Sequence, residues 1–389
     1  MSITAVSAFS QVTVTGEAPI TNNSAINTAL GTAFGPGGSI ISDLQNQLGG
    51  LNIVPNNLIQ GFGNASVYSS HGATQRNFGG YKSLALTFGS SVGIQLPLSP
   101  SELYDIAEGG GDVFDGLFSD GDLKLGVVPQ MLNAQIGFNS LLFKNLYLGV
   151  RIGYTPDFAK MARESQNRMK DLSAEQNIGD VDFGLDGLGF LDNFSYSNFT
   201  LGVTANLQLV KGFSLGGLFA WRGINLGSGF IYQHTQMNIA YPLDAIREDL
   251  GTNGGGGMGN AILTMNPNIF FEMDIKTYTI PVELMTAVKF LFVNIPIGIG
   301  ADFAFGTSTM NIGMRSDMTV TYSANGFEIP TTPGSLNIEA GGKAEPNFSN
   351  LKIMSGIGLS LGPVLIDIPV TYYFKDNGIH VGFTFGLTF

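Results

Sequence analysis

Apolar and polar residues alternate strictly along the last eleven positions of the sequence. One face carries Ile379, Val381, Phe383, Phe385, Leu387 and Phe389, and the other carries His380, Gly382, Thr384, Gly386 and Thr388. This period of two predicts a β-strand with one apolar face and one small, polar face. In a soluble barrel the apolar face points inward, whereas in a membrane barrel it faces lipid and the polar face lines a wet lumen.

The same alternation recurs in nine upstream segments, at 82–97, 132–138, 146–154, 199–209, 213–232, 278–288, 293–305, 351–361 and 364–374. Gly, Ser, Thr and Asn line the second face of these segments. The pattern therefore predicts an all-β fold, a transmembrane antiparallel up-and-down β-barrel. We expect about ten to fourteen strands, with any additional ones most readily placed in 313–342, where Met318, Val320 and Tyr322 alternate again.

The connections differ in length at the two ends of the predicted strands. Four are tight, at 142–145, 210–212, 289–293 and 361–364, and four are long, at 98–129, 156–194, 234–267 and 313–347. Outer-membrane barrels have short periplasmic turns and long external loops. We therefore predict a barrel over 81–389 with a periplasmic C-terminus. The outer turn at 375–378 is short and contains Asn377-Gly378, which suits a hairpin.

Residues 1–80 do not follow the strand pattern. Ser24–Ala33 and Ser39–Leu48 are predicted as helices, separated by the break Gly35–Gly38. We expect this N-terminal segment to form a helical plug or hatch in the lumen, or to lie partly in the periplasm. The small residues at 7–11 suggest the remnant of a signal peptide, and an unrelated start is the alternative.

Composition supports a chain that faces lipid. Charged residues make up 12%, apolar residues 44%, and there are 54 Gly and no Cys, whereas soluble proteins carry about 25% charged residues. Because no apolar run approaches the roughly 20 residues of a membrane helix, spanning requires a closed barrel. The net charge of −12 argues against nucleic acid as a partner. We expect neither a cofactor nor a metal ion.

The polar faces of the predicted strands carry charged and titratable residues, which would point into the lumen. They are Arg151, Arg222, Glu283, Asp302, Lys352, Asp367 and His380. In one interpretation they select solutes, as rings of charge do in channels. In the other they pair with one another across a filled lumen. Both signs are present, so neither an anion nor a cation preference follows.

The remaining motifs do not indicate catalysis. The acidic segment 99–122 is interpreted as a solvated loop rather than a Ca²⁺ site, and the basic stretch 156–180 as a solvated helix; the two loops could pair and close the barrel mouth. The histidines, at 71, 234 and 380, have no carboxylate at a catalytic spacing. We therefore expect that the protein is not an enzyme.

The last strand, Gly378–Phe389, resembles the insertion signal of Gram-negative outer-membrane β-barrel proteins, with Phe383, Phe385, Leu387 and Phe389 on one face. The resemblance implies an outer-membrane location, lipid contacts, and recognition of this strand by the barrel assembly machinery. A large N-terminal segment before a barrel is similar in layout to the outer-membrane transporters of long-chain fatty acids. That similarity implies passage of small solutes, including hydrophobic ones. The alternative is a non-transporting barrel whose external loops act in adhesion or surface structure.

Overall fold

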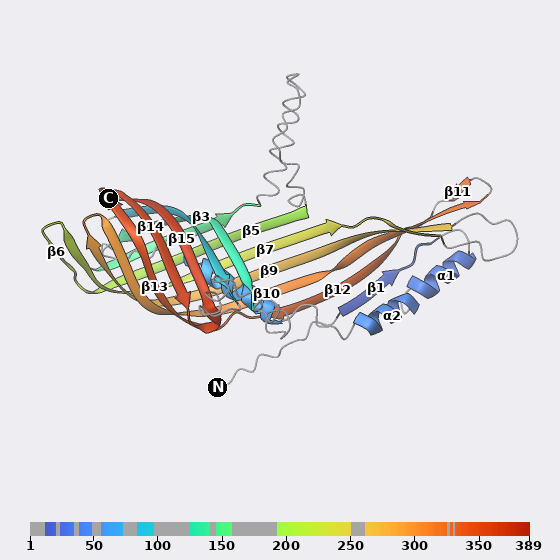
Figure 1. Ribbon diagram of the computed structural model, residues 1–389, viewed down its shortest axis with the longest axis horizontal. Coiled ribbons are helices and arrows are strands. Elements are labelled where there is room, and N and C mark those ends of the chain that lie inside the picture. Colours follow the sequence, from blue (N-terminus) through green and yellow to red (C-terminus); the bar gives the residue numbers. More distant parts are fainter. Residues whose placement is uncertain are drawn as a thin grey trace, which may run out of the picture.

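The computed structural model describes residues 12–20, 24–34, 39–48, 56–72, 84–96, 124–140, 145–157, 193–249, 261–324, 327–329 and 331–389 (Figure 1). Within these residues, ten antiparallel strands form a closed ring. In chain order they are β2 (Leu84–Gln95), β3 (Gly126–Asn139), β4 (Leu146–Thr155), β5 (Phe194–Val210), β7 (Phe219–Pro242), β9 (Ala261–Phe290), β10 (Val293–Ala324), β13 (Ser349–Leu361), β14 (Val364–Tyr373) and β15 (Gly378–Thr388). Pairing of β15 with β2 closes the ring. The predicted antiparallel barrel is confirmed, with a ring at the lower end of the expected strand range.

The two faces of the barrel wall differ as the alternation predicts. Along β2, the inward residues Ala85, Thr87 and Ser91 are buried, whereas Phe88 points outward and is 60% exposed. Ile299 and Ile357 on the outer face are also 60% exposed. An apolar surface that encircles a barrel matches the lipid-facing band of a membrane-spanning barrel. None of the described helices has the length and apolarity that crossing a membrane requires.

Short turns gather at one end of the ring, which we call the short-turn end. Two residues join β9 to β10 and two join β13 to β14. Leu291 and Gly362 adopt positive φ values of 53° and 66° there, as tight turns require. The final residue lies at this end too, because the Phe389 N–H donates to the Leu84 carbonyl. The opposite end, which we call the mouth end, has the predicted tight turn at Lys375–Asn377.

Three wall strands continue beyond the ring at the mouth end. One edge of β10 pairs with β13 over residues 293–303 and then with β12 (Gly334–Ala344) over 308–318. Strand β1 (Val12–Glu17) adds to β12, so that β1, β12 and the distal halves of β10 and β9 form a second region, which we call the extension sheet (Figure 1). Short strands flank the long ones: β6 (Phe213–Leu215), β8 (Ile246–Asp249) and β11 (Phe327–Ile329).

The extension sheet shows that the segments 234–267 and 313–347, expected as long loops, contain strands; additional strands were expected most readily within 313–342, where β11 and most of β12 lie. In the described residues these segments hold the ends of β7 and β9, the distal part of β10, and β8, β11 and β12. Strands β9 and β10 are much longer than the roughly ten residues that a strand needs to cross a membrane. They continue beyond the ring because they remain paired with each other as far as Tyr322 and Ala261.

Two helices cover the extension sheet, and both were predicted from the sequence. They are α1 (Ser24–Phe34) and α2 (Ser39–Leu48). Leu30, Phe34 and Ile41 from these helices pack in one core with apolar residues of the sheet, namely Val12, Val14, Leu263, Met273, Ile275, Met310, Met318, Val320 and Leu336. Gln45 also satisfies the free edge of β1, because its amide accepts from Val14 N–H and donates to the Val12 carbonyl, both at 2.6 Å.

A third helix, α3 (Asn56–Ser69), was not predicted. It is surrounded by β2, β3, β7, β9, β10, β12 and β15, which places it inside the mouth of the barrel (Figure 1). Glycines allow this close fit. A Cβ at Gly93 of β2 would meet the Ala65 carbonyl and the Ser69 nitrogen, and a Cβ at Gly126 of β3 would meet the backbone of Gly61. The N-terminal segment is therefore divided between the barrel mouth and the extension sheet.

Candidate functional site: a charged cluster beneath a helix in the lumen

Helix α3 is held in the mouth by polar contacts. Gln233 on β7 donates to the hydroxyls of Ser66 and Ser69 at 3.0 and 2.8 Å. Tyr68 donates to Gln95 on β2 at 3.0 Å and stacks on Tyr373 of β14 with ring centroids 3.9 Å apart. All six side chains are buried. The helix is thus fastened to opposite parts of the wall by hydrogen bonds as well as by packing.

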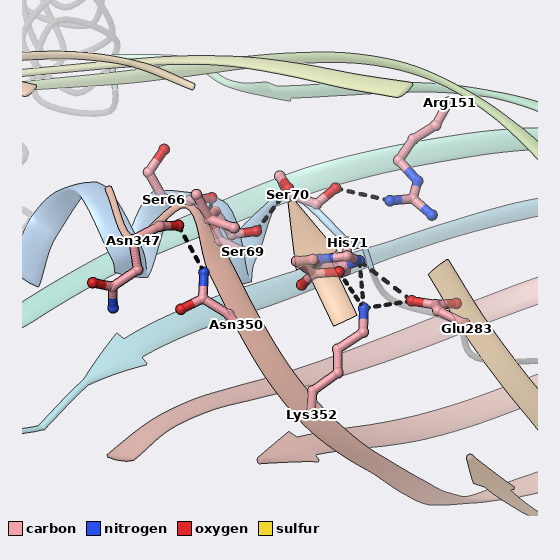
Figure 2. A network of polar contacts seen from close by, with 11 residues as sticks. Ser66, Ser69, Ser70, His71, Arg151, Glu283, Asn347, Asn350 and Lys352 are labelled. Atoms are coloured by element: carbon pink, nitrogen blue, oxygen red, sulfur yellow. Dashed lines mark hydrogen bonds and ion pairs between the residues drawn. The ribbon is translucent and has the colours of Figure 1, made fainter. Parts of the chain in front are cut away.

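Helix α3 ends at Ser69, and in the turn that follows the side chain of His71 enters a cluster of charged wall residues (Figure 2). His71 Nε2 lies 2.6 Å from Asp302 Oδ2 on β10. Lys352 Nζ on β13 lies 2.7 Å from Asp302 Oδ1 and 2.5 Å from Glu283 Oε1 on β9. His71 Nδ1 is 3.4 Å from Lys352 Nζ and 3.7 Å from Glu283 Oε1. One residue of the N-terminal segment therefore completes an ion-pair network built by three wall strands, which we call the His71 cluster.

Arg151 on β4 fastens the same turn from the other side of the lumen. Its Nη1 donates to the Ser70 carbonyl at 2.8 Å (Figure 2), and its Nη2 lies 3.4 Å from Gln135 Oε1. A cavity of about 50 Å³ remains between Arg151 and the cluster, lined also by Met354, Thr371 and His380. A water molecule needs at least about 10–15 Å³ of such space, so the cavity can hold water but is too small for a passing solute.

Three residues of the His71 cluster carry atoms that could bind a metal ion. Ligand atoms of His71, Glu283 and Asp302 lie within 4.8 Å of one another. However, Lys352 Nζ is already within ion-pair distance of both carboxylates. Lysine thereby supplies the positive charge that a metal ion would bring to the buried carboxylate of Asp302 and the half-buried carboxylate of Glu283. The residues fit an ion-pair network better than a metal centre.

A second polar contact lies at the rim of the mouth. Asp376 accepts from Asn347 Nδ2 at 2.7 Å and pairs with Lys124 Nζ at 3.0 Å. Burial raises the pKa of Asp376, but the hydrogen bonds from Asn347 and Lys124 and the charge of Lys124 outweigh it, so the pKa lies below its usual value. Asn347 in turn donates its backbone N–H to Asn64 of α3 at 2.8 Å. This rim therefore connects the turn at Lys375–Asn377 to the helix.

The structure gathers most of the lumenal residues that the sequence suggested. Arg151, Glu283, Asp302, Lys352 and His380 surround the His71 turn. Asp367 is buried on β14 and lies level with Thr384 and Gly358, nearer the short-turn end. Arg222 is half-buried at the short-turn end, beside the irregular pairing between Trp221 and Ile224. Phe383, Phe385, Leu387 and Phe389 point outward from the last strand and its end.

Sequence reasoning missed the partners of two histidines. His71 meets Asp302 across 231 positions of the sequence, and His234 Nε2 lies 3.0 Å from Asp274 Oδ2 on the neighbouring strand. The register of β7 against β9 creates the His234 pair, and the position of the turn after α3 against β10 creates the His71 pair. The acidic segment 99–122 and most of the basic stretch 156–180 lie outside the described residues.

Comparisons with solved structures find membrane barrels. The translocator domain of the autotransporter NalP from Neisseria meningitidis is 8% identical, with a TM-score of 0.28, and the match covers 83% of this chain and 93% of that one. The CymD monoaromatic hydrocarbon channel is 10% identical, with a TM-score of 0.23 and coverage of 79% and 89%. These values are too low to transfer a function.

Sequence comparison gives a family. No curated protein matches the chain. A family model described as Lsa36-like matches residues 8–387, which is nearly the whole sequence, so the chain is a member of the Lsa36-like family.

Proposed function

We propose that the protein is an outer-membrane channel for small solutes, closed in this structure by α3 and the His71 cluster. In this proposal the short-turn end and the C-terminus face the periplasm, and the mouth end faces outward. The asymmetry of the connections supports this orientation, because short turns gather at one end of outer-membrane barrels and long connections at the other.

The polar character of the contacts around α3 is the observation that carries the proposal. Ser66, Ser69 and His71 meet Gln233, Asp302 and Lys352, beside the apolar packing of Ile59 and Val67 on the same helix. When a helix leaves an apolar core, it exposes surface that water solvates poorly. When α3 leaves, water can satisfy the polar groups on both sides. The helix therefore behaves as a removable closure.

The inner wall favours small polar solutes. Beyond the His71 cluster, its inward residues include Asn225, Asn294, Asp367, Thr384 and Thr388, all buried from solvent in the closed state. Hydroxyl and amide groups of this kind bind water and polar solutes in an open lumen. The hydrophobic solutes suggested by the layout of the fatty-acid transporters have less support from this wall.

A disulfide lock tests the proposal, because the native chain contains no cysteine. A Cβ at Gly63 would lie 3.6 Å from Ser308 Cβ on β10, within the range of about 3.5–4.5 Å for disulfides. We would record single-channel currents of Gly63→Cys/Ser308→Cys in planar bilayers at raised voltage. Openings are expected only after reduction, while each single-cysteine variant conducts in both redox states. Absence of openings in every form, including the native protein, would overturn the channel proposal.

The extension sheet favours a second candidate function, display of an external structure. It adds a core of its own beyond the ring, which diffusion through a barrel does not require. If the native barrel proves silent in the conductance experiment, adhesion or a structural role of this external part becomes the leading proposal.

A further inference from the structure

We infer that the protein uses its own barrel interior to carry its N-terminal segment to the cell surface, where β1, α1 and α2 complete an external domain. This inference rests on the orientation given under the proposed function. It concerns the route and destination of the chain, and does not require that solutes pass.

The two ends of the route lie at opposite ends of the barrel. Strand β1 pairs with β12 in the extension sheet, with Val12 opposite Ala340 and Glu17 opposite Ser335. Leu84, where the first wall strand begins, lies at the short-turn end and exchanges backbone hydrogen bonds with Phe389. The segment that joins these points therefore has to pass from one side of the membrane to the other.

The described part of the connection lies inside the ring. Gly61 contacts the backbone of β3, and Ala65 contacts Gly93 of β2, whose Cβ position is filled by α3. Farther along, a Cβ at Gly72 would meet Asn133 of β3 and Arg151 of β4. Buried wall residues thus surround the described chain from α3 to Gly72, which lies within the lumen.

The extension sheet needs the N-terminal segment to cover its apolar core and its free strand edge. Without α1, α2 and β1, the extension sheet would present Met273, Ile275, Met310, Met318 and Val320 to water, all now at most 4% exposed. Large exposed apolar patches are rare on soluble surfaces. Strand β1 also covers the edge of β12, and Gln45 covers the edge of β1, which blocks further strand addition. The N-terminal segment is therefore a structural part of the external domain.

Cysteine labelling of whole cells tests the topology. We would introduce Thr15→Cys on β1, Arg247→Cys on β8 and Ser214→Cys on β6, three exposed positions in a chain without cysteine. Each full-length variant is treated with a membrane-impermeant maleimide, before and after permeabilisation of the outer membrane. The characteristic gel shift of a folded barrel identifies variants that assemble, and only these are scored.

The result expected is labelling of Thr15→Cys and Arg247→Cys on intact cells, and of Ser214→Cys only after permeabilisation. Labelling of Arg247→Cys without Thr15→Cys would overturn the inference while leaving the orientation intact. Labelling of Ser214→Cys alone on intact cells would overturn the orientation itself. Formation of the Gly63→Cys/Ser308→Cys disulfide in cells that label at position 15 would confirm that the route is lumenal, and its absence in the folded protein would contradict that route.

Discussion

Lys352 Nζ on β13 lies 2.7 Å from Asp302 Oδ1 on β10, and both side chains are buried inside a barrel whose outer face is apolar. The same ammonium contacts Glu283, and the same aspartate contacts His71. The pair therefore links the barrel wall to the N-terminal segment that closes the mouth.

We predict that Lys352→Met destabilises the folded barrel by about 3–5 kcal/mol, because it leaves the buried carboxylate of Asp302 and the half-buried carboxylate of Glu283 without their shared cation. Unfolding in detergent, followed by the gel shift of the folded form, measures the effect. The double variant Lys352→Met/Asp302→Asn should recover part of the loss, since one uncompensated charge is removed with the lysine. Additive losses would show that the two side chains do not interact.

Gly93→Ala is predicted to loosen α3 without changing the charges of the lumen. The new Cβ would lie 2.1 Å from the Ala65 carbonyl and 2.5 Å from the Ser69 nitrogen, so the helix has to shift. Faster hydrogen exchange in residues 59–70 and more frequent channel openings are expected. Gly31→Ala on α1, where a Cβ meets nothing within 4 Å, is the matched control. Equal exchange rates in both variants would contradict close packing of α3 on β2.

A charge on the outer face of the wall should oppose membrane insertion. Ile357 on β13 is 60% exposed, and an Arg facing lipid costs about 2–4 kcal/mol at the membrane midplane. We expect Ile357→Arg to lower the free energy of unfolding in lipid vesicles by this amount, while Ile357→Val stays within about 1 kcal/mol of the native barrel. Equal stability of the Arg variant and the native protein would argue against lipid contact at this position.

The rim contact of Asp376 predicts a pH dependence. Burial raises the folded-state pKa of Asp376, but the hydrogen bonds from Asn347 and Lys124 and the charge of Lys124 lower it by more, so the pKa is lowered overall. The stability it contributes is therefore present above the unfolded pKa of about 3.9 and is lost as the pH falls through the lower folded pKa. Asp376→Asn should flatten the fall in unfolding midpoint below about pH 4. The substitution preserves the left-handed backbone, with φ of 59°, because Asn tolerates it well.

Lys124→Met provides the companion measurement. It removes one cause of the lowered pKa of Asp376 while leaving Asn347 in place. A pH profile between those of the native protein and Asp376→Asn is expected. If Asp376→Asn and the native protein lose stability in parallel on acidification, the rim contact does not govern this pH range.

The sequence by itself determined the barrel wall. A period of two marks which side chains of β2, β9, β10 and β15 face lipid, because each strand separates two environments and successive side chains point to opposite faces. The helices α1 and α2 and the tight turn at Lys375–Asn377 were also readable, since local patterning and turn residues specify them. Five of the seven charged or titratable residues predicted to face the lumen surround the turn that contains His71.

Only the tertiary structure decided how these parts meet. Helix α3 contains Gly61, Gly63 and many polar residues, a composition with weak helical signal, and its stability comes from contacts with wall strands distant in sequence. The length of β9 and β10 was hidden because, beyond the ring, apolar residues of the two strands pack in a core with α1, α2 and β1 instead of facing lipid. Their edges there pair with each other, with β8 and with β12. The pairing of His71 with Asp302 depends on the register of a closed ring around a threaded chain, and no local pattern encodes such a contact.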